Sequence, residues 1–314
     1  MTELKEALRA WGARDMRMIK ERENVVHEIR IGATRAALRL HRPGYQSKAA
    51  IRSELTWMGA LSDAGMSVPA PVSTSGGDTV VTLSTGRLAT VVSWVDGAPI
   101  GESGVALEGT PAEQVTLYRN VGREVAQMHN LTDAMDLPDG FTRHAWDVAG
   151  LLGPDPFWGH FWENPVLSAE DRALINRARA VAHDQALAFA QNGADMGLIH
   201  ADVLRENVFV KDGVVTLIDF DDAGFGFRLY DLAVMMTQNE EEPEYPAIRA
   251  AALAGYRELR DLPQQAEDLL DMFLMIRRFA SMGWAVPRYA HDGDALRAYT
   301  GKAVTAAKQF LSSA

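Results

Sequence analysis

Apolar and polar residues alternate with a period of two over much of the first hundred positions, and this pattern predicts β-strands. Helical spacing of apolar residues replaces it after Gly97. The predicted strands cover 16–22, 24–31, 34–41, 79–83 and 88–95, with helices at 3–12 and, after the N-cap Ser47, at 48–64. Further helices are predicted at 115–130, 168–191, 230–236, 245–259, 265–290 and 294–312. The pattern thus predicts an α+β chain with a sheet-rich lobe at 1–95 and a helical lobe at 96–314.

Composition narrows the class of protein. The 314 residues are 47% hydrophobic and include no cysteine, which excludes disulfides and cysteine-ligated zinc. The net charge of −11 argues against a nucleic-acid partner, because binding to the phosphate backbone needs clustered Lys and Arg. A cationic small substrate would suit this charge better. With no long apolar stretch and a charged, helical start, we expect a cytoplasmic protein without membrane contact, as a monomer or homodimer.

Candidate chemistry is concentrated in the stretch 197–233, GLIHADVLRENVFVKDGVVTLIDFDDAGFGFRLYDLA. Asp202 ends an apolar run, Asn207 follows it by five residues, and Asp219 follows the second strand of a predicted hairpin, 208–210 and 214–218. Phosphoryl transfer needs a cation on the phosphate oxygens and a carboxylate that orients and deprotonates the hydroxyl. Asn207 and Asp219 offer oxygen ligands suited to Mg²⁺, which leaves Asp202 as the base. The alternative is an Asp-rich surface turn.

The pattern H-x-D-x-x-x-x-N at 200–207, followed by Ile218 and Asp219, resembles the catalytic loop of the protein-kinase-like fold. Within that superfamily it is most similar to the branch of aminoglycoside phosphotransferases, choline kinases and type II homoserine kinases. The resemblance covers about 14–290 and implies two lobes: a small antiparallel-sheet N-lobe with one main helix, and a larger, mostly helical C-lobe. It also implies ATP and Mg²⁺ as cofactors. Asp231 resembles the family's structural Asp, which holds the catalytic loop through backbone amides; the alternative is a plain acid at a helix start.

A phosphate-binding cation is expected on the strand 34–41. Its alternation places Ala37, Arg39 and His41 on one face, opposite Leu38 and Leu40. By resemblance Arg39 takes the place of the lysine of the kinase pattern V-A-I-K, and an arginine can still pair bidentately with phosphate. Glu54 is the candidate helix glutamate that pairs with Arg39. The alternatives are a solvated Arg39 and an exposed Glu54.

The resemblance also implies residues that bind adenine. The Ser93 carbonyl would accept a hydrogen bond from the adenine amino group, and the Val95 amide would donate to the ring. Apolar side chains would enclose the ring, and the candidates are Ala37, Phe209, Ile218 and either Val25 or Val26.

The sequence differs from the protein-kinase pattern at two places, one that concerns binding of the γ-phosphate and one that concerns the kind of phosphate acceptor. Leu204 stands where protein kinases carry a lysine, so Arg205 is the candidate to stabilise the γ-phosphate; a solvated Arg205 is the alternative. Asp231 follows Asp219 by only twelve positions, and the interval contains no A-P-E signal for seating a peptide. We therefore expect transfer of the γ-phosphate to a small-molecule hydroxyl, on an amino alcohol, an aminoglycoside or a homoserine-like compound.

Several alternatives stay open on sequence alone. A protein Ser/Thr kinase of the stress-response type is one, and a nucleotide-binding module without turnover is another, suggested by the absent glycine-rich pattern. Asp221 and Asp222 could bind a second Mg²⁺ or a substrate amine, or belong to a turn. The aromatic residues of 140–165 could form a substrate wall or pack an insertion, and the turn at Glu23-Asn24 could cover phosphates or be an ordinary hairpin.

Overall fold

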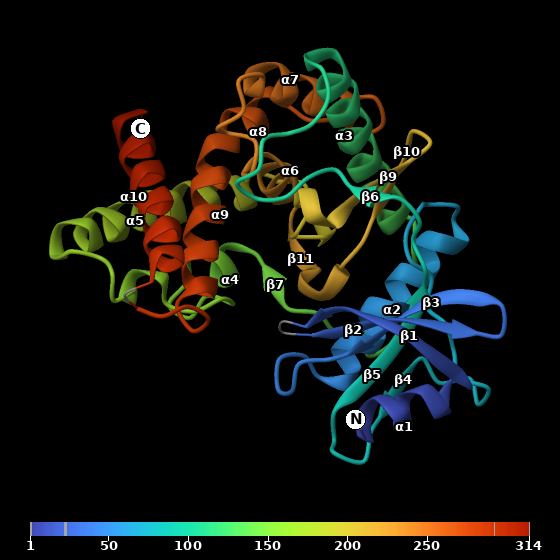
Figure 1. Ribbon diagram of the computed structural model, residues 1–314. Helices are drawn as coiled ribbons and strands as arrows, with labels where there is room; N and C mark the ends of the chain where they lie inside the picture. The colour runs from blue at the N-terminus through green and yellow to red at the C-terminus, as the bar shows by residue number, and fades with distance from the viewer. Residues whose placement is uncertain (1, 22–23, 292, 314) are drawn as a thin grey trace. The chain divides into compact units, whose positions relative to one another are not determined.

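The computed structural model describes residues 2–21, 24–291 and 293–313, which form two compact units (Figure 1). The first unit comprises Met1–Ile100, Leu131–Arg143 and Asn207–Asp221. The second comprises Gly101–Asn130, His144–Glu206 and Asp222–Ala314. The alternating pattern placed a single division after residue 95, whereas the chain returns twice to the first unit. The stretch that carries Asn207 and Asp219 belongs to that unit.

A five-stranded antiparallel sheet forms the body of the first unit, in the order β1-β2-β3-β5-β4. All five predicted strands are present, with ends shifted by a few residues. Ser47 caps the main helix by accepting a hydrogen bond from the Ala50 amide (3.1 Å), as its position predicted. The elements are α1 (Thr2–Ala10), β1 (Ala13–Glu21), β2 (Val25–Ile31), β3 (Thr34–Leu40), α2 (Lys48–Asp63), β4 (Val80–Thr82) and β5 (Leu88–Ser93).

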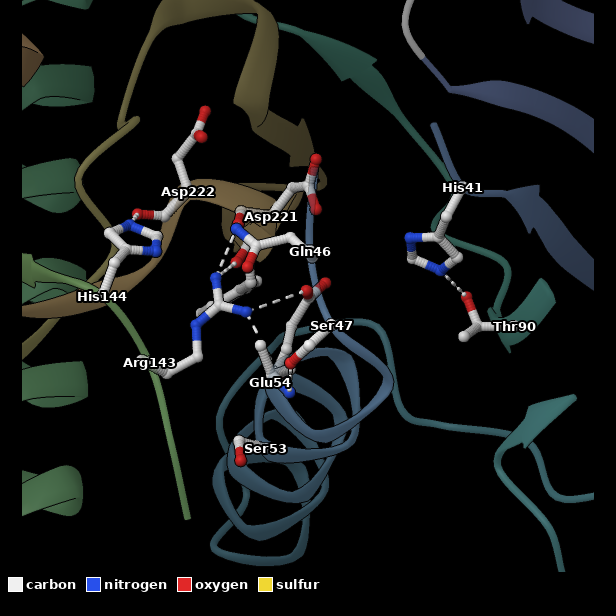
Figure 2. Close-up of polar contacts among 12 residues, drawn as sticks. His41, Gln46, Ser47, Ser53, Glu54, Thr90, Arg143, His144, Asp221 and Asp222 are labelled. Carbon is white, nitrogen blue, oxygen red and sulfur yellow. Dashed lines mark hydrogen bonds and ion pairs between the residues drawn. The ribbon is translucent and has the colours of Figure 1, made fainter. Parts of the chain in front are cut away.

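The alternation along β3 separates the core of this unit from its functional face. Leu38 and Leu40 are buried in a cluster that includes residues of α1, while Ala37 and Arg39 on the other face are half-buried. His41 follows the prediction for this face. It lies just beyond the end of β3, is buried, and pairs with the hydroxyl of Thr90 at 2.9 Å (Figure 2). Thr90 is the β5 residue opposite Arg39, so His41 lies on the face of Arg39, as the alternation predicted.

A second, three-stranded sheet of the first unit carries the predicted hairpin. Its order is β10-β9-β6, with β6 (Ala98–Pro99), β9 (Val208–Lys211) and β10 (Val214–Leu217). The turn before β6 requires Gly97, because its φ is +108° and a Cβ there would lie 2.6 Å from the Val210 carbonyl oxygen. The two-residue strand β6 is too short for an alternating pattern to reveal. Its pairing with β9 links the end of the five-stranded sheet to the hairpin.

The second unit is mainly helical. The predicted helices are present except that the single one expected at 265–290 is divided at Leu269 into α8 and α9, which ends at Ala285. A small sheet, ordered β7-β11-β8, was not predicted. The helices are α3 (Pro111–Asp133), α4 (Val148–Leu152), α5 (Ala169–Gln191), α6 (Arg228–Met236), α7 (Tyr245–Arg257), α8 (Gln264–Asp268), α9 (Leu270–Ala285) and α10 (Asp294–Ser313). The strands are β7 (Ala145–Trp146), β8 (Met196–Ile199) and β11 (Gly224–Phe227).

Short 3₁₀ turns complete the fold: η1 (Phe161–Glu163), η2 (Arg205–Asn207) and η3 (Phe220–Asp222). Across the described ranges, no helix combines the length and apolar character that a bilayer crossing would demand.

The contact between α3 and α7 generates a stability prediction (Figure 1). A Cβ on Gly122 of α3 would lie 2.0 Å from the carbonyl oxygen of Ala252, which is backbone and cannot rotate away. Gly122→Ala should therefore lower the free energy of unfolding by roughly 1–3 kcal/mol, as overpacking does. A Cβ on the exposed Gly301 of α10 would have no neighbouring atom within 4 Å. Gly301→Ala should be stabilising by about 0.5–1 kcal/mol. Thermal unfolding checks both, and equal shifts in the two variants would contradict the packing argument.

Candidate active site

Arg39 lies at the centre of the polar residues on the functional face of the first unit. Its Nη2 donates to Asp219 Oδ1 at 2.8 Å, and its Nη1 lies 3.5 Å from Glu54 Oε1. The predicted pairing of Glu54 with Arg39 is thus present, and Asp219 adds a closer partner. The side chain of Arg39 is 19% exposed and that of Glu54 is 4% exposed. The arginine therefore keeps one accessible side while its partners fix its direction.

Burial and charge have opposite effects on this pair. Burial raises the pKa of Glu54 to about 7, against the lowering influence of Arg39 and Arg143. For Arg39, burial alone would lower the pKa, but Asp219 and Glu54 outweigh it and hold the pKa above its ordinary value. Arg39 is consequently a permanent cation, the form that binds phosphate oxygens.

Asn207 and Asp219 lie at the same end of the β9–β10 hairpin. Asn207 directly precedes β9, Asp219 follows β10 by two positions, and the Ile218 amide donates to the Asn207 carbonyl at 2.9 Å. Asp219 adopts a left-handed backbone conformation with φ of 65°, which is uncommon for a residue other than glycine. The hairpin thus places the two predicted metal ligands together.

The donor set of this hairpin end fits Mg²⁺. It offers one carboxylate and one amide oxygen, and Mg²⁺ usually takes one or two protein carboxylates while phosphates and waters complete its shell. Throughout the described residues, no cluster of three or more His, Asp or Glu side chains could hold a metal by itself. The donor set of Asn207 and Asp219 would leave coordination positions for phosphate oxygens and waters.

Asp221 sits two residues beyond Asp219. Its Oδ2 accepts a hydrogen bond from Asn24 at 3.1 Å, and its carbonyl accepts one from Gln46 at 3.2 Å. Its Oδ1 is buried with no hydrogen-bond partner among the described residues, and burial raises the pKa of this carboxyl. Asn24 belongs to the predicted turn at Glu23-Asn24, of which Glu23 lies outside the described residues. The alternatives for Asp221, metal, amine or turn, stay predictions.

Asp202, the predicted base, lies in the second unit and is held by an arginine of α9. Arg277 Nη2 donates to Asp202 Oδ1 at 2.7 Å, and its Nη1 donates to the Ala201 carbonyl at 3.0 Å. The guanidinium also lies over the ring of Trp158, 4.8 Å from its centroid. The side chain of Arg277 is 5% exposed, whereas that of Asp202 is 18% exposed. Asp202 is thus a fixed carboxylate that keeps an accessible side.

Asp231 holds the same loop from its amide side. Its Oδ1 accepts from the Ala201 amide at 2.6 Å, and its Oδ2 accepts from the His200 amide at 2.9 Å and from His129 Nε2 at 3.0 Å. These are the backbone contacts that the resemblance implied. Ala201 has φ of 62°, a strained conformation that Asp231 on its N–H and Arg277 on its carbonyl maintain together.

His129 is a neutral link in this network. Burial lowers its pKa to about 4, despite the hydrogen bond to Asp231 that raises it. A neutral ring that donates from Nε2 to the carboxylate accepts at Nδ1 from the hydroxyl of Tyr256, 2.9 Å away. Burial would raise the pKa of Asp231, but the hydrogen bond from His129 and those from the backbone hold it below its ordinary value. Asp231 therefore stays ionised while His129 stays neutral.

Arg205 does not occupy the position expected for a phosphate contact. It is 2% exposed, and its guanidinium donates to Asn239 Oδ1 (2.7 and 3.0 Å), to Glu242 Oε1 (2.5 Å) and to the Val105 carbonyl (2.7 Å). This network engages the guanidinium inside the second unit. Arg205 is accordingly a structural ion-pair partner there and not the expected phosphate contact.

The residues expected around adenine all belong to the first unit. Ala37 pairs with Val92 across β3 and β5, and Phe209 lies on β9. The Ser93 amide donates to the Ala70 carbonyl at 2.7 Å, and its Oγ accepts from the Ala70 amide at 2.8 Å, so the end of β5 is anchored. Val95 and Ile218 lie just beyond β5 and β10 and are half-buried.

The first unit also contains a hollow of about 320 Å³, which is separate from the residues expected to bind adenine. None of the residues expected at adenine lines it. It is lined by Glu3, Arg42, Pro43, Gly44, Gln46, Thr85, Gly86, Arg87 and Leu88.

Arg143 and Arg277 were missed by the sequence analysis. Arg143 follows a stretch with no regular pattern, and nothing in its neighbourhood marks it. Arg277 offered a signal, because α9 reads LDMFLMIRRFASMGWA and a charged residue on the buried face of such an apolar helix needs a buried partner. The sequence could not name that partner.

The neutral state of His129 generates a pH prediction. Because the pKa in the folded protein is about 4 against an ordinary 6.5, the unfolded chain binds more protons between these values, and stability falls as the pH falls through that window. Wild type should lose about 3 kcal/mol relative to His129→Gln between pH 6.5 and 4. Urea unfolding over this range measures the difference, with the exposed His160→Gln as control. A difference that does not change with pH would contradict the assignment of a neutral His129.

Comparison with known proteins gives the context for this geometry. Residues 19–299 match the phosphotransferase enzyme family. An amicoumacin kinase of Bacillus subtilis is 24% identical over 289 residues, which cover 85% of this chain and 79% of that protein. A homoserine kinase of Gluconobacter oxydans is 29% identical over 223 residues, covering 67% of this chain and 63% of that protein. The structure of a microcompartment-associated aminopropanol kinase is 29% identical, with a TM-score of 0.79 over 98% of this chain and 94% of that chain.

These similarities confirm the predicted kinase-like fold, with an antiparallel-sheet N-lobe and a largely helical C-lobe. They also confirm the prediction of a kinase that moves a phosphate from ATP to a small-molecule hydroxyl, and they give no support to the protein-kinase alternative. The match of residues 19–299 covers most of the sequence, so this chain belongs to the phosphotransferase enzyme family.

Proposed function

We propose that this chain is an ATP- and Mg²⁺-dependent kinase whose acceptor is the hydroxyl of a short amino alcohol. The observation that carries the proposal is the fixation of Asp202, with Arg277 on its carboxylate and on the Ala201 carbonyl, and Asp231 on the amides before it. A carboxylate held in this way costs little reorganisation when a hydroxyl reaches it. Asp202 would orient that hydroxyl and accept its proton.

The phosphate would be bound by residues of the first unit. Arg39 would donate hydrogen bonds to the phosphate oxygens, and Glu54 would hold the guanidinium of Arg39 in the orientation that this requires. Asn207 and Asp219 would hold Mg²⁺, which when bound neutralises the charge on the phosphates. The support is the Arg39–Asp219 hydrogen bond of 2.8 Å and the placement of Asn207 at the same hairpin end.

Backbone groups at the end of β5 would recognise adenine. The Ser93 carbonyl would accept from the amino group, and the Val95 amide would donate to the ring. Val95 follows the strand end, and in the described part of the chain its amide makes no hydrogen bond with a protein acceptor. Ala37, Phe209 and Ile218 would cover the faces of the ring, where apolar contact desolvates a flat base.

The acceptor class comes from two relatives and from a ring cluster. Aminopropanol and homoserine, named in two of the relatives, both carry an amine and a hydroxyl on a short chain. In the second unit, Trp158 lies beneath Arg277 and packs edge-on against Trp146 at 4.9 Å. We propose that the half-exposed Trp158 walls the acceptor beside Asp202, which favours a compact molecule. The excess of acidic residues agrees with an amine on that molecule.

The acceptor proposal is tested by measuring ADP release with Mg²⁺–ATP and a panel of hydroxyl compounds. Aminopropanol and homoserine should give a kcat/KM at least ~100-fold above that of hygromycin or a Ser/Thr-containing protein, since only compact acceptors fit a small walled site. The same alcohols without the amine serve as matched controls. Preferential transfer to the protein substrates would reject the proposal.

The role of Asp202 is tested by Asp202→Asn, which keeps the size of the side chain but removes the base. Turnover should fall at least ~100-fold, while the Kd for Mg²⁺–ATP changes less than about threefold. Asp212→Asn, in the exposed turn between β9 and β10, is the control and should leave both values unchanged. Normal turnover in Asp202→Asn would remove Asp202 from the chemistry.

A further inference from the structure

Arg143 is a buried arginine that none of the roles described above uses. Its side chain has no exposed area. It ends Leu131–Arg143, a segment of the first unit that lies in the sequence between two stretches of the second. The neighbouring Thr142 amide donates to Ser53 Oγ at 2.9 Å, which attaches the segment to α2. Arg143 thus enters the interior of the first unit from a fixed backbone.

One guanidinium contacts two elements of this interior (Figure 2). On α2, Nη1 donates to the Ala50 carbonyl at 3.2 Å and lies 3.5 Å from Glu54 Oε2. On η3, Nη2 donates to the carbonyls of Phe220 and Asp221 at 3.2 and 2.5 Å. Arg143 therefore cross-links the helix that carries Glu54 to the turn that directly follows Asp219.

Arg39 makes a parallel link from the other side of the same carboxylate. It contacts Glu54 Oε1 and Asp219 Oδ1, whereas Arg143 contacts Glu54 Oε2 and the backbone after Asp219. Loss of Arg143 would leave Glu54, which is almost fully buried, with one cation. It would also remove one donor from the Phe220 carbonyl and one from the Asp221 carbonyl, which keeps its hydrogen bond from Gln46. Both losses are unfavourable for buried groups, and both are relieved by movement of Glu54 or of the turn.

We propose that Arg143 is a positioning residue for phosphoryl transfer. It fixes the backbone beside Asp219 and shares the charge of Glu54, so that the metal ligand and the phosphate-binding Arg39 keep their places. It contacts no atom that reacts. The proposal rests on the proposed function, because the roles of Asp219 and Arg39 are assigned there.

The test uses Arg143→Met and Arg143→Lys in the full chain. Calorimetry measures the Mg²⁺ concentration that gives half-maximal ATP binding, and a steady-state assay measures kcat and KM. Arg143→Met should raise the half-saturating Mg²⁺ concentration roughly 10–100-fold, as loss of a residue that supports a metal ligand typically does. Arg143→Lys should lie between wild type and Arg143→Met, because an ammonium cannot reach acceptors on both elements as a planar guanidinium does.

Arg87→Met is the matched control. Arg87 belongs to the same unit, donates to the Leu40 and His41 carbonyls and pairs with Glu3. Its loss should lower the melting temperature and leave the Mg²⁺ requirement unchanged. An unchanged Mg²⁺ requirement in Arg143→Met, with a melting-temperature shift like that of Arg87→Met, would overturn the proposal. If Arg143→Met does not fold, Arg143→Lys decides by the same readout.

Nucleotide binding separates this proposal from that of the acceptor. A wild type that binds Mg²⁺–ATP but phosphorylates no amino alcohol rejects the acceptor class, while the Mg²⁺ titration of the variants still decides the role of Arg143. A wild type that binds no Mg²⁺–ATP overturns both.

Discussion

A carboxylate removed from water needs hydrogen bonds or cations for its oxygens, and Asp231 satisfies this requirement with the backbone of the catalytic loop. Its two oxygens accept from the Ala201 and His200 amides and from His129. Because the loop supplies these donors, it cannot leave its conformation without leaving a buried charge unpaired. The left-handed backbone of Ala201, which would otherwise be unfavourable, is kept by the same contacts. The orientation of Asp202, the next residue in the loop, is set by these contacts.

Arginine supplies the complementary charge in both units. In the second unit Arg277 binds Asp202, and Arg205 binds Glu242. In the first unit Arg39 and Arg143 flank Glu54. A guanidinium suits these places because it stays ionised when buried and can serve carboxylates and carbonyls at once. Breaking one such pair is more harmful than the pair is stabilising, since the remaining charge stays buried. These arginines therefore contribute more to the positions of the groups that they bind than to the free energy of unfolding.

The residues proposed for phosphoryl transfer are distributed over the two units in a way that their order in the sequence does not suggest. Asn207 and Asp219 belong to the first unit with Arg39, whereas Asp202, only five residues before Asn207, belongs to the second. The short strand β6 explains the grouping, since its pairing with β9 joins the hairpin to the five-stranded sheet. The proposed metal ligands and the proposed phosphate-binding Arg39 thus belong to one unit, while Asp202, the proposed base, is anchored in the other through α6 and α9.

Local patterns in the sequence determined the spacing of Asp202 and Asn207, the hairpin that precedes Asp219, and the alternation of β3 that directs Arg39 away from Leu38. Each of these depends on neighbours within a few residues, where strand and turn geometry is nearly fixed. The pairing of Glu54 with Arg39 and the contacts of Asp231 with the loop were expected from the family resemblance, since their partners lie 15 and 30 residues away, beyond the range of local geometry. The roles of Arg143, Arg205 and Arg277 were decided only by tertiary structure. Their partners lie between 34 and 100 residues away in the sequence, and a long, charged side chain takes whichever carboxylate or carbonyl the folded chain brings to it.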